Sequence, residues 1–200
     1  KSVVDNPLCQ DSRVHPPKGR RKKRRFAGRT GFFMPKKDPA GIMVIVAVDT
    51  EDVAWVLREL VESHQPIDAY WAREAADLQR RYNVVSWECD PSSPENIDAL
   101  RRAGIRAKGA MNRVLPGIQS VGARFSSDRI RISPDCPHLI GELRSYTWRQ
   151  RSDGTTIPDE PVKANDHACD ALRYAIMGLS APRTTATWRT HTARRRRVPA

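Results

Sequence analysis

An unbroken apolar run, Gly41-Ile42-Met43-Val44-Ile45-Val46-Ala47-Val48, constrains the fold of this chain more than any other feature. An apolar, β-branched run without alternation predicts a strand that is buried on both faces. Residues 49–52 have the composition of a turn, and residues 53–57 predict the return strand of a hairpin. The chain is therefore expected to build a central sheet covered by helices.

The remaining pattern alternates short strands with helices, which indicates an α/β fold with a mixed sheet and the hairpin at its N-terminal side. Further strands are expected over residues 24–30, 84–89, 105–109 and 129–132, and helices over 70–82, 94–103, 114–125, 138–144 and 166–179. Residues 149–162 are expected to form a polar loop. These elements predict one folded domain over residues 24–180, preceded by an irregular basic arm (1–23) and followed by a disordered basic tail (181–200).

The charge of the chain is concentrated near its two ends. Residues 1–37 carry 12 Lys/Arg and 2 Asp/Glu (+10), residues 38–180 carry 17 and 21 (−4), and residues 181–200 carry 6 and 0 (+6). Basic arms on a mildly acidic body are typical of nucleic-acid binding, although such runs are also found as solvated tails. Lys18–Arg25, with seven cations in eight positions, could line a DNA groove.

The cysteines and the hydropathy pattern exclude several classes of protein. Four cysteines are present without a Cys-x-x-Cys pair, so a structural zinc site is not expected and the cysteines are interpreted as packing residues. No signal peptide and no apolar run of membrane-spanning length occurs. A reduced, cytosolic setting without membrane contact is expected.

Two places carry carboxylates in positions suited to a metal. Asp90 follows the predicted strand 84–89, and ligands in α/β sheets collect beyond the carboxyl ends of strands. Asp166 and Asp170 are four residues apart and so lie on one helical face, with His167 beside them. Such oxygen ligands suit a hard divalent cation. The alternatives are that Asp90 caps a turn, that Asp166 caps the helix, and that Asp170 is an exposed acid.

A series of short segments resembles the nuclease domain of the large terminase subunit of tailed bacteriophages. The matching segments are Asp90–Glu95, Leu100–Ile105, Ala110–Arg113, Gly117-Ile118, Glu142–Trp148, Pro161–His167 and Asp170–Ala175. The resemblance covers roughly residues 24–180. It implies an RNase H-like fold and a DNA endonuclease that cuts concatemeric viral DNA during genome packaging, using two Mg or Mn ions.

The resemblance also implies roles for individual residues. Asp90 and Asp170 match acidic metal ligands, and Asp166 and His167 match flanking polar positions that assist, with Asp166 as a further ligand. Two metals about 4 Å apart would activate water and stabilise the developing charge. The implied partners are double-stranded DNA, the portal, the small terminase subunit and an ATPase domain that this chain lacks, in the cytoplasm of the bacterial host. The chain is therefore expected to be a domain fragment or an incomplete gene product.

The resemblance breaks at the first strand. The family carries an aspartate there in a Gly-x-Asp-x-Gly context, whereas this chain reads Phe26-Ala27-Gly28-Arg29-Thr30-Gly31-Phe32. An arginine near a metal pair would repel the cations. Asp49 or Asp38 could replace the missing ligand, but Asp49 is expected in a hairpin turn at the opposite end of the sheet.

Two other interpretations stay open, the first of them suggested by that gap and by the basic arms. One is a catalytically silent module that binds DNA or docks on the portal, and the other is a resolvase or transposase core of the RNase H-like type.

Overall fold

A computed structural model of the chain describes residues 26–34, 41–164 and 166–180. Its strands are β1 (Phe26–Met34), β2 (Gly41–Asp49), β3 (Ala54–Glu62), β4 (Ser86–Cys89), β5 (Ala107–Gly109), β6 (Ile130–Ile132), β7 (Trp148–Gln150) and β8 (Thr156–Pro161). Its helices are α1 (Ala72–Tyr82), α2 (Pro94–Arg102), α3 (Val114–Ser126), α4 (Pro137–Ser145) and α5 (His167–Ser180), and a π-helical turn, η2 (Ile67–Trp71), leads into α1.

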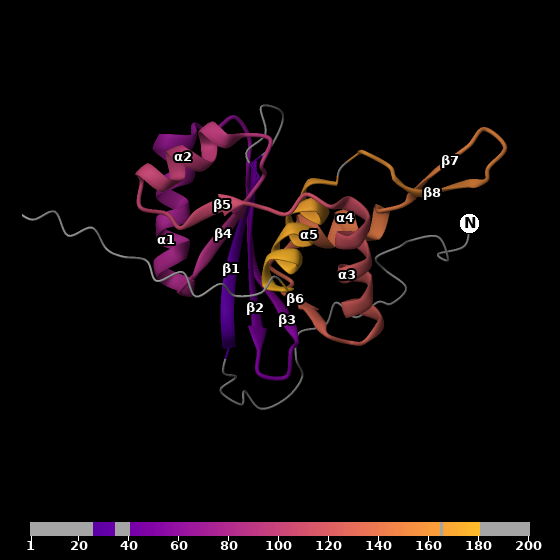
Figure 1. Cartoon of the computed structure of the whole chain (residues 1–200), viewed down its shortest axis with the longest axis horizontal. Helices are drawn as coiled ribbons and strands as arrows, with labels where there is room; N and C mark the ends of the chain where they lie inside the picture. The colour runs from indigo at the N-terminus through magenta and orange to yellow at the C-terminus, as the bar shows by residue number, and fades with distance from the viewer. Residues whose placement is uncertain (1–25, 35–40, 165, 181–200) are drawn as a thin grey trace, which may run out of the picture.

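Six strands form one mixed sheet in the order β5-β4-β1-β2-β3-β6. Strands β1, β2 and β3 are consecutive and antiparallel. The outer strands are added in parallel, with β4 beside β1, β5 beside β4 and β6 beside β3. Figure 1 shows α1 and α2 on one side of this sheet and α3, α4 and α5 on the other. The predicted mixed sheet flanked by helices is confirmed.

Strand β2 lies at the centre of the sheet and is buried on both faces, as its unbroken apolar run predicts. Val44 and Val46 pack into the core beneath α3, α4 and α5. Met43 and Ile45 point the other way, into the core beneath α1 and α2. One strand thus supplies both cores, because successive side chains of a strand point to opposite faces.

Helix α5 lies across the sheet and packs against α3 and α4 as well. Its residues from Ala168 to Met177 are all buried. The apolar positions expected on one stripe of this helix, among them Leu172 and Ile176, face the core. The polar positions are buried too, so the single-stripe pattern understates how deeply the helix sits.

The sequence prediction was wrong for residues 149–162. They were expected to form a polar loop, but β7 and β8 pair there as a two-stranded hairpin that projects from the body (Figure 1). The two strands lie outside the main sheet, β7 has only three residues, and Pro158 and Pro161 of β8 argue against a strand on composition. The hairpin of β2 and β3 also extends further than expected, to Glu62.

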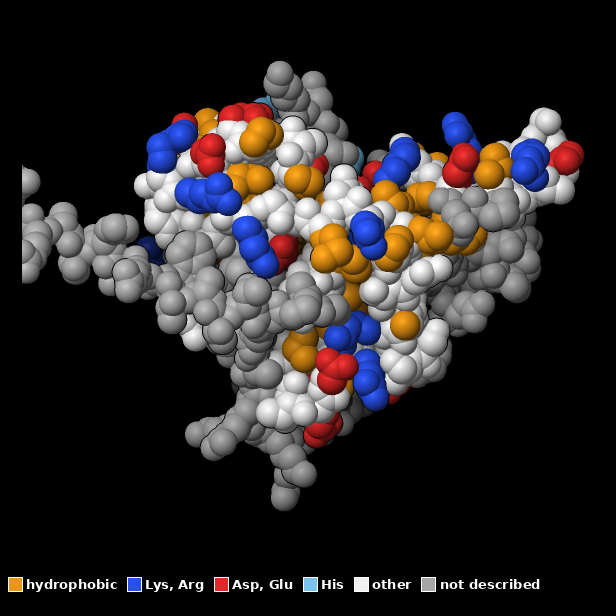
Figure 2. Space-filling view, in the orientation of Figure 1, with side chains coloured by type: hydrophobic (Ala, Val, Ile, Leu, Met, Phe, Trp, Pro, Cys, Tyr) orange, Lys and Arg blue, Asp and Glu red, His pale blue; other side chains and the backbone are white. Residues whose placement is uncertain are grey.

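The described surface carries mixed charge. Figure 2 shows Lys and Arg side chains intermingled with Asp and Glu over one face. The excess positive charge belongs to residues 1–37 and 181–200, of which the structure describes only 26–34. The predicted basic arm (1–23) and tail (181–200) lie outside the described residues, so those boundaries stay predictions. Among the described helices, none is both long and apolar enough to cross a membrane.

The three described cysteines, Cys89, Cys136 and Cys169, are free and buried. Burial raises the pKa of the Cys89 and Cys136 thiols to about 12 and raises that of Cys169 as well. Thiols in this state are protonated and unreactive, as the interpretation as packing residues requires.

Leu172→Ala should destabilise the domain by about 2–5 kcal/mol, because the fully buried side chain would leave a cavity between α5 and the sheet. Val85→Ala is the control, since Val85 is 40% exposed and its loss should change stability by no more than about 0.5 kcal/mol. Urea unfolding of both variants measures the difference. Equal losses would contradict the burial of α5 described above.

Candidate functional site

Asp90 directly follows β4 and lies in the turn that leads to α2. Its Oδ1 accepts the backbone N–H of Ser92 at 2.9 Å, so the turn contact named in the alternative interpretation is present. Strand β4 runs parallel to β1, with Cys89 opposite Phe33, so Asp90 stands at the edge where both strands end. Ligands of α/β sheets collect at this edge. A metal-binding role for Asp90 stays a prediction.

Asp166 and Asp170 lie at the start of α5 and are buried, with 3% and 9% of their surface exposed. The N–H of Asp170 donates to the carbonyl of Asp166, which places the two residues one helical turn apart. Both carboxylates meet the ammonium of Lys163, at 3.2 Å from Asp166 Oδ2 and 3.7 Å from Asp170 Oδ2. The two side chains therefore converge on one positive charge. The alternative that Asp170 is an exposed acid is wrong.

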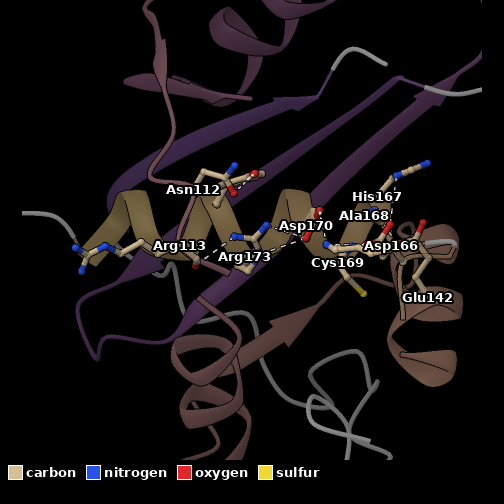
Figure 3. Close-up of polar contacts among 11 residues, drawn as sticks. Asn112, Arg113, Glu142, Asp166, His167, Ala168, Cys169, Asp170 and Arg173 are labelled. Carbon is tan, nitrogen blue, oxygen red and sulfur yellow. Dashed lines mark hydrogen bonds and ion pairs between the residues drawn. The ribbon is translucent and has the colours of Figure 1, made fainter. Parts of the chain in front are cut away.

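The second oxygen of Asp170 is held by Arg173. The guanidinium donates from Nη2 at 2.8 Å and from Nε at 3.2 Å to Asp170 Oδ1 (Figure 3). Arg173 is itself buried, stacks on the Tyr174 ring at 4.3 Å, and donates from Nη1 to the carbonyl of Arg113. Asp170 thus has a fixed orientation, with Oδ1 bound by Arg173 and Oδ2 directed to Lys163.

His167 is the first residue of α5 and lies next to Asp166. Its Nδ1 is 3.6 Å from Asp166 Oδ1, and its side chain is partly exposed. Figure 3 shows the imidazole directed away from Asp170. The structure therefore groups His167 with Asp166.

Asp90 lies on the side of the sheet that α5 covers. Two residues earlier, Glu88 is buried against α5, where a Cβ on Gly178 would meet its carboxyl group. Tyr174 gives a second indication. Burial raises the pKa of its phenol, and the negative charges of Asp90 and Asp170 act in the same direction. Both carboxylates therefore lie near one α5 side chain, while a shared metal ion stays a prediction.

Asp49, the suggested replacement ligand, lies at the other end of the sheet. It pairs with Phe26 at the start of β1, whereas Asp90 stands where β1 ends. Its carboxylate accepts the N–H groups of Glu51 and Val53 and the indole of Trp55, so it organises the β2–β3 turn as the sequence indicated. Asp38 lies outside the described residues.

Glu142 of α4 supports the start of α5 and was not identified as functional from the sequence. Its Oε2 accepts the backbone N–H groups of Ala168 at 2.6 Å and Cys169 at 3.0 Å (Figure 3). Burial raises the pKa of this carboxyl to about 7. The negative charges of Asp166 and Glu59 also raise this pKa, whereas the two N–H donors lower it. Lys163, three residues before Asp166 and outside the helix, was also missed, because no helical spacing relates the two side chains.

The described residues contain no group of three or more His, Cys, Asp or Glu side chains arranged to hold a metal ion. What they do contain is a pair of carboxylates that converge on an ammonium, with Asp90 on the same side of the sheet. Hard oxygen donors of this kind suit Mg or Mn.

Known proteins share this arrangement of strands and helices. The sequence profile described as "Terminase RNAseH like domain" matches residues 36–177. The chain belongs to this family. The predicted RNase H-like fold, and the resemblance to terminase nuclease domains, are thereby confirmed.

Individual relatives agree. The large terminase subunit of Escherichia phage T5 is 29% identical over 161 residues, which cover 78% of this chain and 36% of that protein. The large terminase of a thermophilic bacteriophage superposes with a TM-score of 0.70 at 22% identity, over 87% of this chain and 44% of that one. The nuclease domain of the bacteriophage SPP1 large terminase, solved with bound Mn, superposes with a TM-score of 0.64 at 25% identity, over 76% of this chain and 86% of that one. This chain thus spans less than half of the longer relatives.

The family match starts at residue 36 and so leaves out β1, the strand in which the expected aspartate is missing. The side chains of Thr30 and Phe32 lie on the face of β1 that α5 covers, because they alternate with Gly31 and Phe32 stacks on Tyr174 at 4.9 Å. Neither carries a carboxylate. Along the described part of that face, β1 offers the site an aromatic ring and a hydroxyl.

Gly117→Ala should destabilise the domain by about 1–3 kcal/mol, because a Cβ on this α3 residue would overlap Cγ of Arg173 and push the guanidinium from Asp170. Gly141→Ala in α4 is a matched control. Nothing lies within 4 Å of its added Cβ, so it should be neutral or stabilise by up to about 1 kcal/mol. Urea unfolding compares the two, and a neutral Gly117→Ala would rule out the tight α3–α5 contact.

Glu142 should make stability depend on pH. Its pKa is raised from 4.5 to about 7 in the folded state, so the folded chain binds the proton more tightly than the unfolded chain. The stability that this group contributes is present at low pH and is lost as pH rises through about 7. Glu142→Gln should therefore gain stability relative to the unaltered chain between about pH 5 and about pH 8. Urea unfolding at both values tests this, with exposed Glu62→Gln as control; parallel pH profiles would contradict it.

Proposed function

We propose that this domain is the metal-dependent endonuclease module of a phage terminase large subunit and cuts double-stranded DNA during genome packaging. The observation that carries the proposal is the convergence of Asp166 and Asp170 on the Lys163 ammonium at the start of α5. Family membership supplies the type of reaction, and the SPP1 nuclease domain, solved with bound Mn, supports a divalent ion.

Three carboxylates would hold the metal in this proposal: Asp90, Asp166 and Asp170. The Lys163 ammonium occupies the position proposed for the cation, because Asp166 Oδ2 and Asp170 Oδ2 both point to it. Bound divalent ions supply a nucleophilic water at neutral pH and stabilise the charge that develops on the phosphate.

The surrounding side chains have distinct tasks. Arg173 orients Asp170 through two hydrogen bonds to Oδ1 and leaves Oδ2 directed toward the shared cation. His167, beside Asp166 and partly exposed, is placed to accept or donate a proton through its imidazole. Buried Arg173 also places a positive charge beside the Asp170 carboxylate.

The proposed partners follow from the relatives' names and from the charge of the chain. Double-stranded DNA would meet the basic arms, through phosphate contacts that carry no sequence information. The portal, the small terminase subunit and an ATPase domain would complete the packaging machinery, in the cytoplasm of the bacterial host. This chain spans 36% of the T5 protein, which leaves room there for such a domain.

A second candidate function is a catalytically silent module that binds DNA or docks on the portal. The specific observation in its favour is β1, whose described residues facing α5, Thr30 and Phe32, include no carboxylate. The silent module predicts salt-sensitive DNA binding without cleavage.

Nicking of supercoiled plasmid by the purified chain with Mn or Mg tests the first function. Asp90→Asn and Asp170→Asn should each lower the rate by roughly 100-fold or more, since even outer partners of metal ligands cost 10–100-fold when lost. Asp77→Asn is the control, because its side chain is 57% exposed on α1, on the other side of the sheet.

Two outcomes separate the candidates. Equal cleavage by the unaltered chain and both variants would refute the site. Absence of cleavage by a folded, unaltered chain, together with binding that weakens steeply with salt, would select the silent module. Thermal melts accompany each assay, because Asp170 pairs with a buried arginine.

A further inference from the structure

We propose that Glu59 and Glu142 are positioning residues: each caps the helix after it, so that β3 fixes the start of α4 and α4 fixes the start of α5. The inference rests on the proposed function in one respect only, namely that the carboxylates so positioned, Asp166 and Asp170, bind metal.

The first link joins the sheet to α4. Glu59 of β3 is buried, with 6% of its surface exposed. Its Oε1 accepts the N–H of His138 at 2.8 Å, and its Oε2 accepts the N–H of Leu139 at 2.9 Å. The residue that precedes α4, Cys136, makes no capping bond through its side chain. A strand residue thus supplies the acceptors that a helix start requires.

An irregularity in β3 aims Glu59 at this helix. Val56 pairs with Val46, but Arg58 pairs with the adjacent Ile45, so β3 contains one extra residue at Leu57. A bulge of this kind reverses which residues face each side of the sheet. Without it, Glu59 would share the face of Leu57 and point toward α1. With it, Glu59 lies on the face of Val56 and Val61, which α4 and α5 cover.

The second link joins α4 to α5. Glu142 sits one turn along α4 from Leu139, whose N–H binds Glu59, and its Oε2 accepts the N–H groups of Ala168 and Cys169. Those two amides belong to the first turn of α5, directly between Asp166 and Asp170. The carboxylate also meets the positive end of the helix dipole. The backbone that carries the acidic pair is therefore tied to α4, and through α4 to β3.

The two caps differ in a way that an experiment can separate. Glu59 uses both carboxyl oxygens, one for each N–H, whereas Glu142 uses Oε2 for both. Glutamine has a single acceptor oxygen. Glu142→Gln can therefore retain its cap, while Glu59→Gln must lose one of its two bonds to backbone N–H groups; the imidazole Nδ1 of His138 also contacts Glu59 Oε1, at 2.9 Å.

Amide hydrogen exchange tests the two caps and requires no metal. Glu142→Ala should raise exchange at Ala168 and Cys169 by about 10-fold or more, and Glu142→Gln should leave it within about 3-fold. Glu59→Gln should raise exchange at His138 or Leu139. Glu62→Ala, an exposed change at the end of the same strand, is the control.

Calorimetric titration with Mn tests whether Glu142 positions the carboxylates that are proposed to bind metal. Glu142→Ala should raise the Mn concentration for half-saturation by roughly 10–100-fold, and Glu142→Gln should restore it, as expected for outer partners of metal ligands. A cap that affected stability alone would lower the melting temperature and leave half-saturation unchanged.

The outcomes distinguish this inference from the proposed function. Unchanged exchange at Ala168 and Cys169 in Glu142→Ala would overturn the cap. Raised exchange with unchanged Mn half-saturation would overturn the positioning role. Failure of the unaltered chain to bind Mn would overturn the nuclease proposal alone, because the exchange pattern is read without metal. If Glu142→Ala does not fold, the contrast between Glu59→Gln and Glu142→Gln still decides.

Discussion

Burial of α5 on all sides is the constraint from which the polar structure of this domain follows. The helix is enclosed by the sheet, α3 and α4, so a charge or an unpaired amide at its start has little access to water. Such groups are costly unless they are paired within the protein. Arg173 pairs with Asp170, Lys163 with both carboxylates, and Glu142 with two amides. Each contact gives a buried charge or amide a partner within the protein.

That pairing also suits the cation binding proposed for this site. Arg173 holds Asp170 by one oxygen and so orients the other, while Lys163 is 57% exposed and can withdraw into water. Its departure would leave two convergent carboxylate oxygens and little reorganisation for an incoming ion. Pre-orientation of ligands in this way reduces the cost of binding.

The sequence predicts most of the fold, because the fold is dominated by short-range patterns. The run through β2 and the helical periodicity of α5 are each read within one element. The side-chain environments are harder to read, because they depend on several elements at once. Asp170 and Arg173 appear exposed on a helix with one apolar stripe, yet α3 and α4 cover that side too. The cap from Glu59 to α4 joins residues 79 positions apart in the sequence, and it depends on a β3 bulge that no sequence pattern predicts.

Charge balance shows why the first strand matters. In the proposed site, Asp166 and Asp170 would contribute two formal negative charges, Arg173 would offset one, and Asp90 would bring the total back to two, the charge of one divalent ion. Two divalent ions about 4 Å apart repel each other by about 16 kcal/mol at an effective dielectric constant of 20, four times the value for unit charges. A further carboxylate, such as the first-strand aspartate that the family resemblance implies, would offset part of that repulsion. In this chain the described residues of β1 facing α5, Thr30 and Phe32, supply none, so this strand does not offset that repulsion there.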